Sequence, residues 1–111
     1  MSDWERVEAE AAAIIGERPA EYDAATRQNL AELLQLVQET GRPAPLLSPG
    51  YWPTFCVTWE TAGSENLEIE VFDDRYEVYR FFAGKTEIWY EHHKPGEPVS
   101  SAFLGELPDP T

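Results

Sequence analysis

The stretch from residue 67 to residue 82, LEIEVFDDRYEVYRFF, constrains the fold of this chain more than any other. Apolar and polar residues alternate in it with a period of two on both sides of a short acidic break. Such alternation predicts an antiparallel β-hairpin with one buried face. Because like charges directly opposite each other destabilise a sheet, the sequence favours the register that pairs Phe72 with Glu77 over the one that sets Glu70 against Glu77.

The same alternation appears in two further stretches. It runs from Thr54 to Glu60 before the hairpin and from Thr86 to Glu91 after it. Together with the hairpin these stretches predict four antiparallel strands joined as a meander, within residues 54–93. The expected core residues of this sheet are Phe55, Trp59, Val78 and Ile88.

Two helices are predicted ahead of the strands, within residues 1–41. Ser2 and Glu5 have the spacing of a capping box, so the first helix begins there. Asp23 can cap the second helix. That helix carries an apolar stripe wide enough to cover one face of a sheet, formed by Leu30, Leu33, Leu34 and Val37.

The order of these elements predicts an α+β domain. Residues 42–53 contain too many prolines for a helix or a central strand and are expected to form an extended connector. Residues 94–111 are expected to form a turn, a short C-terminal helix and a tail. With 111 residues the chain forms one domain, in which N-terminal helices pack on a four-stranded antiparallel meander sheet.

The charge of the chain limits its partners. The formal net charge is −13, with −5 in residues 1–45 (four bases, nine acids) and −8 in residues 46–111 (four bases, twelve acids). Such a surface repels a phosphate backbone, so direct nucleic-acid binding is not expected. A single cysteine, no signal-like N-terminus and no apolar run of about 20 residues indicate a cytoplasmic protein without a membrane segment.

Acidic and aromatic residues are expected on the outer face of the hairpin. Carboxylates attract Mg²⁺ or Ca²⁺, but their spacing here lacks the pattern of a calcium loop, so no metal or other cofactor is expected. A face rich in aromatic residues and poor in lysine has the composition of an interface centre. The predicted contact residues for a basic protein partner are Glu68, Glu70, Asp73, Asp74, Glu77, Tyr79 and Phe81.

The sequence offers no catalytic motif. His92 and His93 are neighbours on a strand, so their side chains point to opposite faces, and both are expected in solvent near a turn. No serine or cysteine nucleophile shares a motif with them, which predicts a protein that is not an enzyme. An alternative is a small-ligand site or enzyme with an aromatic pocket between sheet and helix, lined by Trp52, Trp89 and His92.

Two segments, SPGYWPTFCVTWE and LEIEVFDDRYEVYRFFAGKTEIWY, resemble small uncharacterised bacterial α+β proteins. In those proteins a helix precedes a strand ending in Trp-Glu, here Trp59-Glu60, and a Leu-Glu-Ile-Glu-Val strand, here residues 67–71. The resemblance covers about residues 24–92. It implies a bacterial or phage origin and the order of helix then sheet, and it brings no catalytic or binding residue.

These observations together predict a non-enzymatic module that binds another protein, in the manner of an antitoxin, immunity protein or inhibitor. Its acidic and aromatic sheet face would dock on a basic partner. One variant is a mimic of DNA that inhibits a DNA-binding protein, although the many aromatic residues fit that role less well. A homodimer that covers the aromatic face is a further alternative.

Overall fold

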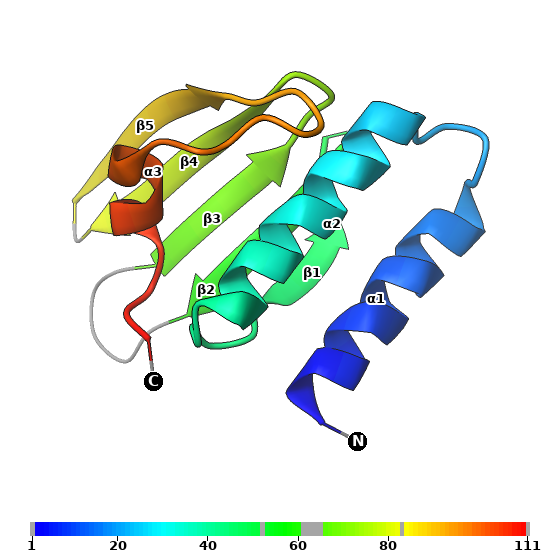
Figure 1. The fold of residues 1–111 in the computed structure, drawn as a ribbon, viewed down its shortest axis with the longest axis horizontal. Coiled ribbons are helices and arrows are strands. Elements are labelled where there is room, and N and C mark those ends of the chain that lie inside the picture. The colour runs from blue at the N-terminus through cyan, green and yellow to red at the C-terminus, as the bar shows by residue number, and fades with distance from the viewer. Residues whose placement is uncertain (1, 52, 61–65, 83, 111) are drawn as a thin grey trace.

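The computed structural model describes residues 2–51, 53–60, 66–82 and 84–110, and its fold is α+β, as predicted. Two helices come first, five strands follow, and a short helix lies near the C-terminus (Figure 1). In chain order the elements are α1 (Asp3–Glu17), α2 (Ala24–Glu39), β1 (Leu46–Pro49), β2 (Phe55–Glu60), β3 (Asn66–Val71), β4 (Arg75–Phe82), β5 (Lys85–His92) and α3 (Ser101–Glu106).

The five strands form one antiparallel meander in the order β1-β2-β3-β4-β5. The prediction of four strands was wrong, because the segment expected to be a connector contributes β1, so that the sheet begins at Leu46. Pro49 is tolerated at the end of β1 because β1 is an edge strand, whose outward N–H groups need not join the ladder. Leu47, opposite Val57, turns inward and is buried.

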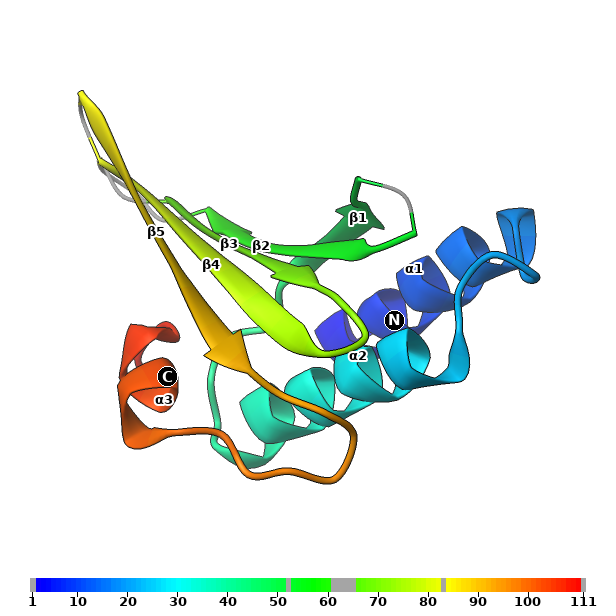
Figure 2. The same cartoon turned by 90° about the horizontal axis from the view of Figure 1, so that it is seen from above.

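All three helices lie on one face of the sheet, and the other face carries no helix (Figure 2). The core lies between the two layers. α2 contributes the apolar stripe predicted for it, with Leu30, Leu33 and Val37 buried. From the sheet, the core residues include Phe55, Val57, Trp59, Leu67, Ile69, Val71, Tyr76 and Val78.

The first two helices begin where the sequence predicts. Ser2 and Glu5 form a capping box, in which the Ser2 side chain accepts a hydrogen bond from the Glu5 N–H and the Glu5 side chain accepts one from the Ser2 N–H. The Asp23 side chain accepts a hydrogen bond of 2.7 Å from the Thr26 N–H and so caps α2. Local capping chemistry therefore sets both starts.

Ile88 was predicted in the core and is instead 55% exposed on the outer face. Apolar residues occupy both sides of β5, so its alternation does not say which side faces inward. The pairing with β4 decides: Trp89 lies opposite Val78 and turns toward the helices. There its ring meets the edge of the Phe103 ring, with the ring centroids 6.2 Å apart.

The predicted hairpin register was also wrong. Val71 pairs with Tyr76, and Glu70 lies directly opposite Glu77, the arrangement that like-charge repulsion argued against. The shift from the predicted register is two residues, so every side chain stays on its predicted face. Glu70 and Glu77 each accept hydrogen bonds from other groups of the protein, and these bonds offset the repulsion.

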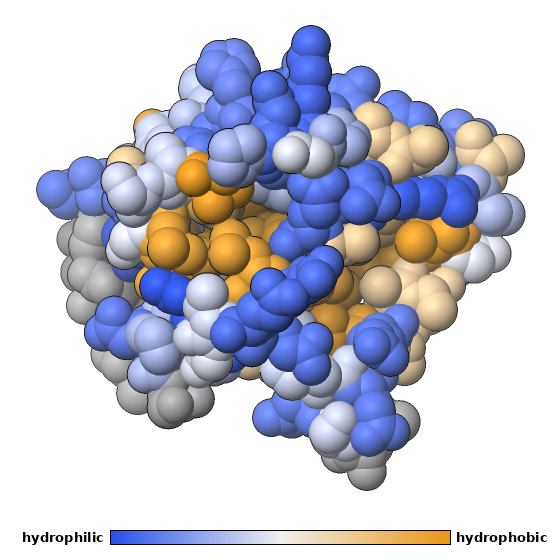
Figure 3. Space-filling model, in the orientation of Figure 1, coloured by the Kyte–Doolittle hydropathy of each residue, from blue (hydrophilic) through white to orange (hydrophobic). Residues whose placement is uncertain are grey.

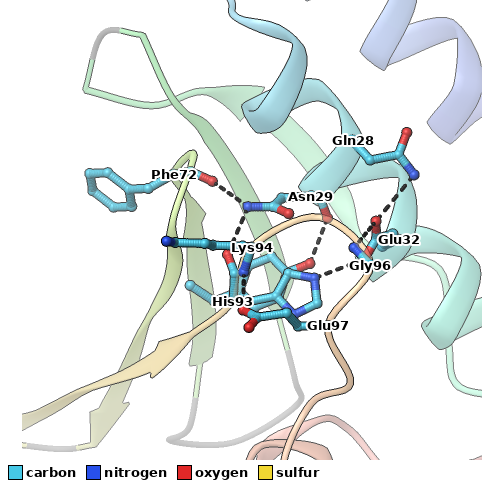
Figure 4. A network of polar contacts seen from close by, with 9 residues as sticks. Gln28, Asn29, Glu32, Phe72, His93, Lys94, Gly96 and Glu97 are labelled. Carbon is cyan, nitrogen blue, oxygen red and sulfur yellow. Dashed lines mark hydrogen bonds and ion pairs between the residues drawn. The ribbon is translucent and has the colours of Figure 1, made fainter.

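A buried polar network joins α2 to the ends of β3 and β5 (Figure 4). The Asn29 side-chain amide donates to the Phe72 carbonyl at 2.9 Å and to the His93 carbonyl at 3.0 Å. The Asn29 backbone carbonyl in turn accepts a hydrogen bond from the Tyr76 hydroxyl at 2.6 Å. One buried side chain thus fixes the distance between the long helix and two strand ends that are far apart in sequence.

His93 belongs to this network, so the expectation that it lies in solvent was wrong. It is 2% exposed, its ring stacks on Tyr76, and its Nε2 lies 2.8 Å from Oε1 of Glu32. Burial works to raise the pKa of Glu32, but hydrogen bonds from His93, Gln28 and Gly96 outweigh it and lower that pKa. The sequence misplaced His93 because nothing local shows that the chain turns back under α2.

Among the described residues, no helix combines the length and apolar character that spanning a membrane requires.

Replacing Asn29 with Ala is expected to destabilise the fold by about 2–4 kcal/mol, because the buried His93 carbonyl and the part-buried Phe72 carbonyl lose their donor. Thermal and urea unfolding would measure the loss. Gln28→Ala is the matched control, since Gln28 lies one position earlier in α2, is exposed and reaches only Glu32. Equal stability of the two variants would contradict the role given to Asn29.

Candidate functional site

The outer face of the sheet, the face without helices, is the candidate site (Figure 2). Antiparallel pairing arranges its side chains in cross-strand rows. One row runs from β1 to β5 through Leu46, Thr58, Glu68, Tyr79 and Ile88. The adjacent row runs through Ser48, Cys56, Glu70, Glu77 and Tyr90. Carboxylates therefore occupy the centre of this face, and aromatic and aliphatic groups occupy its β4–β5 side.

Glu70, at the centre, is only 4% exposed. Its carboxylate accepts hydrogen bonds from the Thr54 hydroxyl and from the Tyr51 N–H, both in the loop between β1 and β2. A Cβ on Gly50 would collide with the Thr54 hydroxyl and crowd the Glu70 carboxylate, so this loop fits over Glu70 only with glycine there. Glu70 anchors the loop and is poorly placed to touch a partner.

Glu77, opposite Glu70, is held by two donors on its own strand. Nε of Arg75 donates to it at 2.8 Å and the Tyr79 hydroxyl at 2.6 Å. The hydrogen bond from the Tyr79 hydroxyl to Glu77, together with burial, raises the pKa of that hydroxyl, which stays protonated. Arg75 also pairs with Asp74 at 2.8 Å, and its guanidinium lies 3.8 Å from the centre of the Phe72 ring. The carboxylate and the phenol are thus fixed in one geometry.

Glu68 differs from these two carboxylates. It is half-buried between Thr58 and Tyr79, and no described residue donates a hydrogen bond to it. Burial, and secondarily the charge of Glu70, raise the pKa of Glu68. An acid that has lost part of its hydration without gaining a donor can gain free energy when a donor from outside arrives.

The β4–β5 side of the face is apolar and exposed. Ile88 is 55% exposed, Tyr90 60% and Phe81 37%, and Tyr79 lies between Glu68 and Ile88. We call Tyr79, Phe81, Ile88 and Tyr90 the apolar margin. Arg75 is the one Lys or Arg among the described strand residues of the outer face, and it is already bonded to two acids.

The structure thus brings together five of the seven predicted contact residues: Glu68, Glu70, Glu77, Tyr79 and Phe81. Asp73 and Asp74 lie exposed at the turn between β3 and β4, at one end of this face. Sequence reasoning missed Ile88 and Tyr90. Their alternation with Trp89 was visible, but only the pairing with β4 shows that they share the face of Tyr79.

The residues of the alternative pocket are not brought together. Trp89 faces the helices, whereas His92 is exposed on the outer face opposite Arg75, and Trp52 lies outside the described residues. The helix side does show apolar side chains in hollows between the elements (Figure 3). One hollow is an open cleft of about 250 Å³ between α2 and the segment after β5, lined in part by His93, Glu97 and Val99.

Within the part of the chain that the structure describes, no three His, Cys, Asp or Glu side chains are grouped so that they could hold a metal ion. The carboxylates of the outer face are instead paired with protein donors or set apart on the sheet. The arrangement offers charge and shape for recognition.

Replacing Glu68 with Gln is expected to raise stability at pH 7, by less than about 1 kcal/mol because solvent screens a half-buried group. A raised pKa means that the folded state binds the proton more tightly than the unfolded state, so ionised Glu68 lowers stability as pH rises above 4.5. The gain should vanish below that pH. Urea unfolding at pH 4 and pH 7 measures it, with Glu8→Gln on α1 as control, and a loss of stability at pH 7 would contradict the argument.

Cys56 should react slowly with alkylating reagents in the folded protein. Burial, then the charges of Glu68 and Glu70, raise the pKa of its thiol from 9.0 to about 12. The reactive thiolate is then roughly a thousandfold scarcer at pH 8 than for an ordinary thiol. Labelling with iodoacetamide, followed by mass spectrometry with and without guanidinium, tests this, and equal rates in both conditions would refute it.

The comparisons with known proteins do not assign the chain to a group. No protein-family model, no curated protein and no solved structure matches it. The resemblance to small bacterial α+β proteins therefore stays a prediction.

Proposed function

We propose that this chain is a small protein-binding module, comparable to an antitoxin, immunity protein or inhibitor, and that it docks a basic protein through the outer face of its sheet. One observation carries the proposal: a sheet face without helices joins a carboxylate centre to an exposed apolar margin, without an unpaired cation among its described strand residues. Charge then steers the partner and the apolar margin supplies contact area.

Two acids of this face suit a cationic partner, each for its own reason. Glu77 is 13% exposed and held by Arg75 and Tyr79, so little side-chain entropy is lost when a partner binds near it. Glu68 lies across the strand pair from Tyr79 and has no described donor. An arginine of the partner that reaches Glu68 would satisfy this half-buried carboxylate and stack beside the Tyr79 ring.

The apolar margin supports a protein partner over a nucleic acid. Tyr79, Phe81, Ile88 and Tyr90 form a continuous apolar area beside the acids, which resembles the centre of a protein interface. A mimic of DNA needs carboxylates spread over the whole docking surface, and here they fill only the middle rows. The net charge of −13 would speed the encounter with a basic surface at low salt.

The proposal is tested by capturing partners from the native cell on immobilised protein. Two single variants change the face without touching β5: Glu68→Lys reverses the unpaired acid, and Phe81→Ser removes part of the margin. Each is expected to weaken capture of the partner about tenfold or more, as for interface hot spots. The captured protein should be basic and should be released by raised salt.

Glu8→Lys is the matched control, because it changes the net charge as Glu68→Lys does but lies exposed on α1, in the helical layer. It should capture the partner as the unchanged protein does. If Glu68→Lys and Phe81→Ser retain the partner while folding normally by circular dichroism, or if the partner is acidic, the outer face is not the docking surface.

A further inference from the structure

The two edges of the sheet are treated differently. At β1, one helix protects the edge: the Glu10 carboxylate accepts a hydrogen bond from the Leu47 N–H at 3.2 Å, and Nη2 of Arg6 donates to the Pro45 carbonyl at 3.0 Å. β1 is also short and ends in Pro49. These are features by which proteins keep an edge strand from pairing with another chain.

The edge at β5 lacks these features. The strand has eight residues and contains no proline, and no helix or strand of the described residues pairs with it beyond β4 (Figure 1). The His93 N–H donates to the Asp74 carbonyl at 3.0 Å. Because hydrogen-bonded positions alternate along an antiparallel strand, the odd-numbered residues of β5 bond to β4. The N–H and C=O groups of Thr86, Ile88, Tyr90 and His92 therefore point away from the sheet, toward the free edge.

We propose that a second copy of this chain pairs with this edge, β5 against β5, antiparallel about a twofold axis. The proposal does not depend on the proposed function. Directly opposed residues must share a face of the sheet, so the registers that center a residue on the axis are few. They can be compared by the pairs they create.

The register centred on Ile88 has the most favourable pairs. It sets Ile88 against its own copy, Thr86 against Tyr90, and Lys85 against Glu91 of the other chain. Centring Trp89 would oppose Glu87 to Glu91 twice, and centring Glu87 would oppose it to itself, both like-charge arrangements. Only the Ile88 register keeps seven residues of each strand opposed without such a pair.

The geometry of the edge suits this register. Ile88 and Tyr90 are two of the most exposed apolar side chains described. Ile88 would lie beside its copy at the axis, and Tyr90 would lie against Thr86 of the second copy. The Glu91 carboxylate is already positioned by the Ser100 N–H at 2.7 Å and the Ser100 hydroxyl at 2.9 Å, so it can meet Lys85 of the second copy with little loss of entropy. About six backbone hydrogen bonds would form between the strands.

The net charge of each copy opposes this association, so the stability of the dimer should depend on salt concentration. Two chains of charge −13 repel each other, and salt screens the repulsion. The dimer should therefore strengthen as salt is raised, whereas docking of a basic partner should weaken. The outer faces of the two copies would become one surface, with the apolar margins joined at its centre and the acids on either side.

Sedimentation equilibrium of the purified full chain tests the proposal over a concentration series that reaches high micromolar values. The expected mass is twice 12.6 kDa, with a dissociation constant that falls as salt is raised. Ile88→Lys places two like charges on the axis and should weaken the dimer about tenfold or more. Phe81→Lys, the same change of charge on the same face but on β4, should leave it within about twofold.

Oxidative cross-linking in a Cys56→Ser background tests the register. In a hydrogen-bonded antiparallel pair the opposed Cα atoms lie about 5.5 Å apart, within reach of a disulfide, so Ile88→Cys should form a covalent dimer. Tyr90→Cys, whose opposite residue is Thr86, should cross-link far less. A chain that stays monomeric at all salt concentrations, or equal effects of Ile88→Lys and Phe81→Lys, would overturn the proposal.

Discussion

The fold depends on one buried amide. Asn29 donates to carbonyls at the ends of β3 and β5, so the position of α2 over the sheet is set by two hydrogen bonds in addition to apolar packing. Apolar contacts are tolerant of small shifts, whereas an amide between two carbonyls is not. The same network buries His93 and ties the chain after β5 to α2 on the helix side of the sheet. α3, the described element after β5, follows that path, so no described helix lies on the outer face.

The opposed pair Glu70 and Glu77 shows why like-charge repulsion did not predict the register: each carboxylate accepts hydrogen bonds from other groups. Repulsion across a strand pair is worth up to about 1 kcal/mol, and two or three hydrogen bonds to a charged group outweigh it. Thr54 and the Tyr51 N–H serve Glu70, while Arg75 and Tyr79 serve Glu77. The donors to Glu70 come from the loop between β1 and β2, and the donors to Glu77 come from its own strand. The alternation of apolar and polar residues does not show that this loop approaches Glu70.

The sequence was sufficient for patterns that depend on local chemistry. The capping residues Ser2 and Asp23, the stripe of α2 and the face assignment of the hairpin all follow from spacing. It was insufficient where a tertiary contact decides. β1 ends in a proline that its edge position permits. β5 is apolar on both sides, so its pairing with β4 selects Trp89 for the core and leaves Ile88 outside. The acidic residues of the candidate site were therefore predictable. Of the apolar margin, Tyr79 and Phe81 were predicted, whereas Ile88 and Tyr90 were not.

Acidity alone does not identify the docking surface, since the helical layer is acidic as well. Residues 1–45 carry a net charge of −5, and exposed glutamates such as Glu8 and Glu21 lie there. What distinguishes the outer face is that its charges adjoin exposed apolar groups: Glu77 is held by Arg75 and Tyr79, and the half-buried Glu68 lies opposite Tyr79. A diffuse negative field attracts any cation and releases it in salt; a fixed carboxylate beside an aromatic ring selects for a cation of defined position. In the docking that we propose, specificity would come from the short row that joins Glu68, Tyr79 and Ile88, where a carboxylate and apolar groups lie within the reach of one partner side chain.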